Sequence, residues 1–154
     1  MKETNSNKII VRNRKARHDY EITDTLEVGI SLLGSEVKSL RDGKVTISDA
    51  YAEIKDGEVL LKNLHISPYK MSADNNHDPL RVRRLLLHKR EIRKLKAKTE
   101  QKGMTLIPLS IYVKGKVFKI ELSLAIGRKK YDKREVIAKA DAARRIKSAM
   151  KKDI

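Results

Sequence analysis

Residues 107–126, with the sequence IPLSIYVKGKVFKIELSLAI, decide the fold. Apolar residues occupy alternate positions on both sides of a central Lys-Gly-Lys segment: Ile107, Leu109, Ile111 and Val113 before it, then Phe118, Ile120, Leu122, Leu124 and Ile126. Such alternation is typical of strands with one buried face. Gly115 supplies the positive φ that a tight turn between antiparallel strands needs. The stretch therefore predicts a β-hairpin.

Two further segments carry strand signals. Residues 20–32 alternate apolar and polar side chains, which predicts a half-buried strand. Residues 52–66 contain Asp56-Gly57 between apolar residues, and this dipeptide is a strong hairpin signal. Together with the first hairpin they predict five or six short antiparallel strands.

Two helices are predicted between these strands. Residues 34–42 offer Ser35 as an N-cap and stop before Gly43. Residues 88–102 consist largely of strong helix formers and end before Gly103. Ile92 and Leu95 lie on one side of this second helix, so we expect that side to face the core.

The predicted fold class is mainly β: a small antiparallel Greek-key OB-type barrel with two or three inserted helices and a flexible basic C-terminal tail. We expect a disordered N-terminus over residues 1–8, the barrel over 9–127 and the tail over 128–154. The alanine-rich stripe of the tail would bury little apolar surface. The tail is therefore predicted to be disordered when free and helical on an RNA surface such as the ribosome. A solvated amphipathic helix lying on the barrel is the alternative.

The charge balance points to a polyanionic partner. The 154 residues suit one compact domain, and 36 Lys and Arg against 20 Asp and Glu give a formal net charge of +16. The absence of cysteine excludes disulfides and cysteine-ligated zinc. Because the sequence has no long apolar stretch and no lipidation signal, we expect a soluble, cytoplasmic protein without a membrane partner. Nucleic acid is the leading candidate.

Catalysis finds no support in the sequence. The four histidines, His18, His65, His77 and His88, are scattered, and no acidic cluster suggests a two-metal nuclease site. We therefore predict no enzymatic activity, no metal, no cofactor and no small-molecule substrate. An RNA-processing enzyme that uses His18 or His77 and a structural ribosomal protein both stay open as alternatives.

The distribution of cations and aromatic residues indicates how RNA would be bound. Five tyrosines and one phenylalanine are too few for stacking many unpaired bases. Cations gather in three groups, within residues 12–17, within residues 81–98 and in the tail. We expect a folded RNA that is held through its phosphates, with a few polar side chains reaching 2′-hydroxyls and base edges.

Five strings of the sequence resemble motifs of one known family. They are NRKARHDY at 13–20, GSEVKSLR at 34–41, NLHISPY at 63–69, DPLRVRRLLLHKRE at 78–91 and KYDKRE at 130–135. In this order they resemble small protein B, the bacterial tmRNA-binding or SsrA-binding protein family. The chain departs from the usual family pattern at Ile126, where many members have lysine, and at His88, where many have asparagine.

The resemblance implies an OB-type barrel that binds the tRNA-like domain of tmRNA and delivers it to stalled ribosomes for trans-translation. It implies tmRNA-binding residues at Asn13, Lys15, Arg17, His18, Glu27, Lys38, Arg84, Leu86, His88 and Lys119. It also implies a ribosome-binding tail that enters the decoding site and the empty mRNA path through Arg128, Lys129, Lys130, Tyr131, Asp132, Lys133 and Arg134. Elongation factor Tu, within the alanyl-tmRNA complex, is a further implied partner. Glu27 would accept hydrogen bonds from base or ribose donors.

Overall fold

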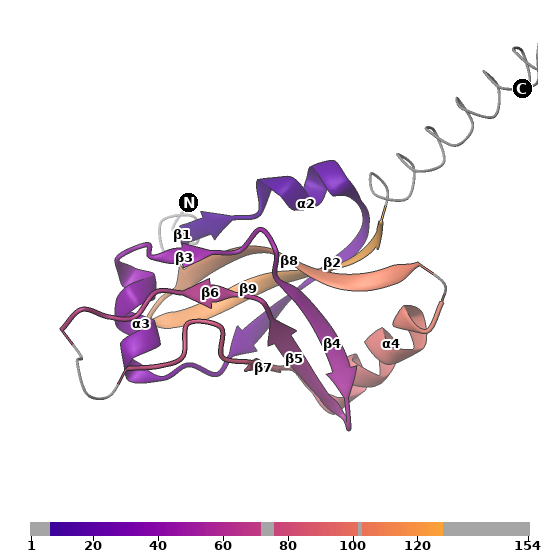
Figure 1. The fold of residues 1–154 in the computed structure, drawn as a ribbon. Coiled ribbons are helices and arrows are strands. Elements are labelled where there is room, and N and C mark those ends of the chain that lie inside the picture. Colours follow the sequence, from indigo (N-terminus) through magenta and orange to yellow (C-terminus); the bar gives the residue numbers. More distant parts are fainter. Residues whose placement is uncertain (1–6, 72–75, 102, 128–154) are drawn as a thin grey trace, which may run out of the picture.

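The computed structural model describes residues 7–71, 76–101 and 103–127 (Figure 1). The strands are β1 (Asn7–Arg12), β2 (Tyr20–Ile30), β3 (Val45–Thr46), β4 (Tyr51–Lys55), β5 (Glu58–Lys62), β6 (His65–Ile66), β7 (Arg83–Leu86), β8 (Met104–Lys114) and β9 (Val117–Gly127). The helices are α2 (Arg14–Asp19), α3 (Gly34–Arg41) and α4 (Lys89–Thr99). The prediction of a mainly β chain with two or three inserted helices is confirmed for these residues.

Antiparallel pairing closes the main sheet into a ring. The strands follow the order β1, β8, β4, β5, β7, β2, β9, and β9 pairs in turn with β8. The long strand β8 therefore contributes to the ring and also holds β1. A second, two-stranded sheet joins β3 to β6. Closure of this kind leaves few unpaired strand edges in the described residues.

Both predicted hairpins are confirmed. β8 and β9 pair from Met104 with Ile126 to Lys114 with Val117, and Gly115 in the turn has φ +66°. β4 and β5 meet at Asp56 and Gly57, whose φ angles are 51° and 77°. Two successive positive φ values characterise the turn type that matches the twist of a hairpin.

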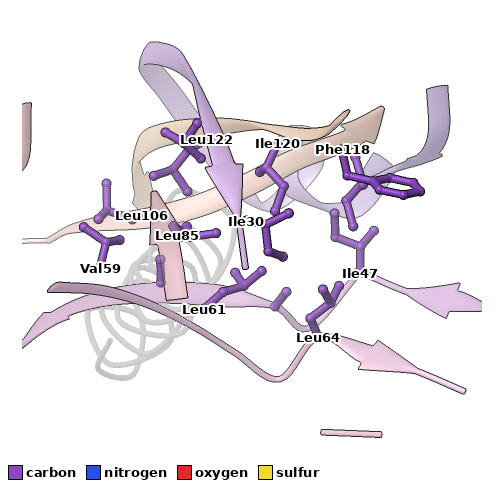
Figure 2. Packing of buried hydrophobic residues seen from close by; sticks show 14 of the residues in the cluster. Ile30, Ile47, Val59, Leu61, Leu64, Leu85, Leu106, Phe118, Ile120 and Leu122 are labelled. Carbon is purple, nitrogen blue, oxygen red and sulfur yellow. The ribbon is translucent and has the colours of Figure 1, made fainter. Parts of the chain in front are cut away.

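Apolar side chains from all parts of the ring fill its interior. Figure 2 shows Leu61, Leu85 and Ile120, from three different strands, pointing into one cluster. Leu61, Ile111 and Ile120 are completely buried. Full burial of such a side chain stabilises the fold by about 1.5–3 kcal/mol.

In β9 the alternating positions supply this core, as the sequence predicts. In β8 the predicted single face is wrong: Ile111 and Val113 face the main core, but Ile107 and Leu109 belong to a second cluster. A register shift between Pro108 and Ser110 interrupts the alternation.

The two predicted helices form, with different boundaries and caps. α3 begins after Leu33, whose backbone N–H donates to Glu36 Oε1 at 2.7 Å. Ser35 is therefore not the N-cap; its hydroxyl lies 2.8 Å from Nδ1 of the buried His77. α4 ends at Thr99 rather than at residue 102, and its buried residue is Leu95, as expected.

The sequence signals did not reveal α2. Only Ala16 is buried in this short helix, so no apolar period marks it. Ala16 packs with Ile107, Leu109 and Ala125 in a second apolar cluster, on the side of β8 and β9 opposite the main core. For this reason Ser123, which alternation assigns to the polar face, is completely buried.

The predicted domain boundaries, at residues 8 and 127, fall near the ends of the described residues. β1 begins at Asn7, inside the segment 1–8 that was expected to be disordered, and residues 1–6 lie outside the described residues. The predicted tail 128–154 also lies outside them. Among the helices of the described ranges, none is both long enough and apolar enough to cross a membrane.

Candidate nucleic-acid interface

Strand register places three of the predicted contact residues on one surface. Gly29 of β2 pairs with Leu86 of β7 on one side and with Lys119 of β9 on the other. Lys119 pairs in turn with Tyr112 of β8. Side chains of directly paired residues lie on the same face of a sheet. Two residues along β2, Glu27 joins this outward face. We call Glu27, Leu86, Tyr112, Lys119 and Glu121 the outer sheet face.

Gly29 shapes this face through its missing side chain. A Cβ at position 29 would lie 3.3 Å from Cβ of Leu86, which is closer than most real Cβ contacts. Leu86 keeps 48% of its surface exposed, although it lies in the middle of the sheet. Glycine thus lets an apolar side chain lie over the neighbouring strand and stay available to a partner.

Glu27 is held in place by two side chains of β8, which lies beyond β9 from β2. Its carboxylate accepts hydrogen bonds from the hydroxyl of Tyr112 and, at 3.3 Å, from Nζ of Lys114. The Tyr112 bond and the charges of Lys114 and Lys119 lower the pKa of Glu27 below its usual value. Burial and the bond to Glu27 raise the pKa of Tyr112. Glu27 is therefore an ionised acceptor near neutral pH, and two of its roughly four lone-pair positions stay open to a ligand.

The α2 helix carries a second group of predicted contacts. Lys15, Arg17 and His18 are exposed on it. Asn13 is buried beneath them: its Oδ1 accepts from the N–H of Ala16 at 3.0 Å, and its Nδ2 donates to the carbonyl of Pro108 at 3.0 Å. Asn13 therefore begins α2 and fixes it to β8, which positions the exposed side chains of the helix.

The other predicted contacts are spread around the ring. Arg84 lies two residues before Leu86 on the exposed side of β7, with Nη1 3.2 Å from Glu58 Oε2. His88 is the exposed N-cap residue of α4. Lys38 lies on α3, which packs against β6, and its Nζ is 5.6 Å from the centre of the Tyr69 ring. Within residues 7–71, 76–101 and 103–127, no hydrogen bond or ion pair joins Lys38 to the outer sheet face. Residues 128–134 of the predicted site lie outside the described residues.

Two adjoining hollows connect the outer sheet face with α2. One, of about 640 Å³, is lined partly by Glu27 and Tyr112. The other, of about 320 Å³, is lined partly by Arg12, Arg14 and Arg17. Ile9, Ser110 and Glu121 line both of them. Sequence reasoning missed Tyr112 and Glu121 as site residues, although strand alternation places Glu121 on the same face as Lys119.

His18 and His77, the histidines of the alternative enzyme hypothesis, lie in different environments. His77 is buried between the Ser35 hydroxyl and the carbonyl of Ile66, each 2.8 Å from one ring nitrogen. His18 is exposed on α2, with Nδ1 3.5 Å from Asp19 Oδ1. In the described part of the chain, no group of three or more His, Asp or Glu side chains is placed to hold a metal ion.

Comparison with known proteins gives consistent matches over almost the whole chain. The family described as SmpB protein matches residues 10–152. The SsrA-binding protein of Halothermothrix orenii is 58% identical over 144 residues, covering 94% of this chain and 93% of that protein. The SsrA-binding protein of Alkaliphilus oremlandii is 59% identical over 139 residues, or 90% of each. A chain in a solved structure described as "tmRNA-SmpB: a journey to the center of the bacterial ribosome" is similar with a TM-score of 0.65 and 53% identity, covering 77% of this chain and 84% of that one.

Proposed function

This chain belongs to the SmpB protein family, and on that premise we propose that it binds tmRNA, the SsrA RNA, and acts with it on the ribosome in trans-translation. The observation that carries the proposal is the match over residues 10–152 to a family of SsrA-binding proteins. The formal charge of +16 suits such a polyanionic partner. The protein would act by binding and delivery rather than by covalent chemistry.

The outer sheet face is the proposed contact with the tRNA-like domain of tmRNA. It combines a cation at Lys119, an exposed apolar side chain at Leu86 and an ionised acceptor at Glu27. These supply the phosphate contact, the packing against a sugar or base and the base-edge or ribose contact that a folded RNA requires. Lys15, Arg17 and His18 on α2, Lys38 on α3, Arg84 and His88 would extend the contact, and Asn13 would act by holding α2.

Two finer assignments extend the proposed function. We infer that it is an OB-type barrel, since its antiparallel strands close around one core with α4 inserted between β7 and β8. We also assign Arg128 to Arg134 to the ribosome, at the decoding site and the empty mRNA path. Residues 128–154 would be disordered before binding and helical on the ribosome. Elongation factor Tu would join through the alanyl-tmRNA complex, in the cytoplasm.

A division of labour between the sheet and the tail tests this proposal. Truncation after Gly127 should leave tmRNA affinity within a few fold of that of the full chain but abolish peptide tagging on stalled ribosomes. In the full-length chain, Leu86→Ala combined with Lys119→Glu should weaken tmRNA binding instead. Circular dichroism would verify that each variant is folded. Loss of tmRNA binding in the truncated chain, or unchanged binding in the double variant, would contradict the assignment.

A further inference from the structure

Glu121 lies on the outer sheet face directly opposite another carboxylate. It pairs directly with Glu27 across β2 and β9, and like charges at directly paired positions destabilise a sheet. Glu27 is stabilised by Tyr112 and Lys114. The Glu121 side chain is half-buried, and within the described ranges neither a hydrogen bond nor an ion pair engages its carboxylate. No side-chain oxygen of the described residues is both buried and without a partner, so the Glu121 carboxylate is accessible from the surface and can accept donors from a ligand.

The two hollows beside Glu121 suit the two ends of a nucleotide, its phosphate and its base. The hollow toward α2 is lined by Arg12, Arg14 and Arg17, which suit a phosphate. The hollow toward β2 is lined by Glu27, Tyr112 and the exposed Ile9, which is 43% accessible. An apolar surface bordered by acceptors suits the face and edge of a base. Because both hollows share Glu121, Ser110 and Ile9, we treat them as one groove, named here the Glu121 groove.

We propose that the Glu121 groove binds one unstacked guanine nucleotide of the RNA, with its phosphate among the arginines and its N1–H and N2–H donating to the Glu121 carboxylate. This inference rests on the proposed function and adds to it a base-reading residue. Guanine fits because its Watson–Crick edge presents two adjacent donors, which a carboxylate accepts in parallel. Adenine and cytosine place an acceptor beside their amino group, and uracil places its single N–H between two carbonyls, so each would leave part of the carboxylate unpaired.

A substitution that keeps the shape of the side chain but removes its charge separates base recognition from simple electrostatics. Glu121→Gln in the full-length chain removes a negative charge, which by itself should strengthen RNA binding. If Glu121 reads guanine, the substitution should instead weaken binding of the tRNA-like domain of tmRNA about tenfold, on the scale of a bidentate base contact. The slope of log affinity against log salt should stay unchanged, since no phosphate contact is lost. Glu100→Gln, at the exposed C-terminal end of α4, is the matched control and should not weaken binding.

Binding by Glu121→Gln that equals or exceeds wild-type binding would overturn the groove assignment and leave the proposed function intact. If the wild-type chain failed to bind tmRNA, the proposed function itself would fail, and the groove assignment with it. Thermal unfolding of Glu121→Gln should not occur at a lower temperature, since the substitution relieves repulsion from Glu27. A weakened but equally stable variant therefore supports the inference.

Base identity is tested by titration of the full-length chain with nucleoside monophosphates, followed by amide NMR shifts. GMP should shift the amide resonances of Ser110 and Glu121 at lower concentration than IMP, which lacks the 2-amino donor, and AMP should be weakest. In Glu121→Gln the difference between GMP and IMP should disappear. Equal responses to GMP, IMP and AMP would overturn the guanine assignment.

Discussion

Arg83 donates a hydrogen bond from Nε to Oε2 of Glu36 over 2.8 Å, and neither side chain is exposed to solvent. Arg81 adds two bonds to the same carboxylate, at 2.7 and 3.0 Å. The guanidinium of Arg83 also reaches the carbonyl of Leu64 at 2.6 Å. This cluster ties α3, β7 and the segment before β7 together. Among the described residues, Glu36 and Arg83 are the only Lys, Arg, Asp or Glu side chains that are buried.

Removing the carboxylate of Glu36 should therefore destabilise the fold strongly. Glu36→Gln is expected to lower the free energy of unfolding by about 3–5 kcal/mol, because Arg83 keeps a buried charge without its counterion. Urea denaturation of the full chain measures the change. Glu58→Gln is the matched control: it breaks the exposed pair with Arg84, and we expect a loss of about 1 kcal/mol or less. Equal losses of unfolding free energy in the two variants would show that the buried cluster stabilises the fold no more than the exposed ion pair does.

The same cluster should set the acid stability of the protein. Burial alone would raise the pKa of Glu36, but hydrogen bonds from Arg81 and from the N–H of Leu33, with the charge of Arg83, lower it below 4.5. A carboxyl group with a lowered pKa stabilises the folded chain above its unfolded pKa and loses this effect as pH falls through the folded pKa. Unfolding free energy should therefore decrease below about pH 4.5 in the wild type more steeply than in Glu36→Gln, as measured by urea titrations from about pH 7 to about pH 3. Parallel curves would contradict this prediction.

Tyr112 should control the ionisation of Glu27. Its hydroxyl makes the largest contribution to the lowered pKa of Glu27, so Tyr112→Phe is expected to raise that pKa toward 4.5. Carbon-detected NMR of the Glu27 carboxyl group during an acid titration measures the shift. Tyr51→Phe, at a tyrosine outside the outer sheet face, serves as the control. An unchanged Glu27 titration in Tyr112→Phe would mean that the bond does not persist in solution.

Asn13 should matter for folding rather than for direct contact. Asn13→Ala removes the N-cap of α2 and leaves the Pro108 carbonyl without its side-chain donor. We expect a loss of about 1–2 kcal/mol in unfolding free energy, the usual range for a lost cap. Arg14→Ala, on the exposed side of the same helix, should change stability by about 0.5 kcal/mol or less. A stable Asn13→Ala variant with weakened RNA binding would instead identify Asn13 as a contact residue.

Lys119 should contribute one phosphate contact. Lys119→Gln is expected to weaken tmRNA binding and to reduce the salt slope by about 1, as the loss of a single phosphate contact does. Affinities measured over a series of salt concentrations give this slope. Lys55→Gln, at the exposed end of β4 and outside the outer sheet face, should leave the slope unchanged. Identical slopes for wild type and Lys119→Gln would remove Lys119 from the phosphate contacts.

Turn residues and apolar alternation correctly predicted the two hairpins and outward positions in β2 and β9. The two hairpins follow from glycines at positive φ, and alternation in β2 and β9 correctly placed Glu27 and Lys119 on outward positions. β7 could not be predicted in this way, since its sequence Arg83-Arg84-Leu85-Leu86 has no alternation of polarity. An arginine can face the core at position 83 only because Glu36, far away in the sequence, neutralises it.

The candidate site was predictable residue by residue but not as an arrangement. Motif resemblance pointed to Glu27, Leu86 and Lys119, and only the pairing of β7, β2 and β9 shows that they share a face. The burial of Asn13 follows from the packing of α2 on β8, where its side chain bonds the carbonyl of Pro108, far away in the sequence. The bond between Tyr112 and Glu27 joins strands that are neighbours only through β9, which no local pattern encodes.

The last pair of the ladder between β2 and β9 joins Tyr20 to Gly127, directly beside the end of α2. The described chain therefore ends beside the end of α2 that carries Arg17 and His18. Once tmRNA bound at this helix has reached the ribosome, the ribosomal RNA would meet the lysines and arginines of the C-terminal segment as an intramolecular encounter, at an effective concentration on the order of millimolar. The same peptide supplied as a separate molecule would forfeit that advantage, whatever its own affinity for RNA.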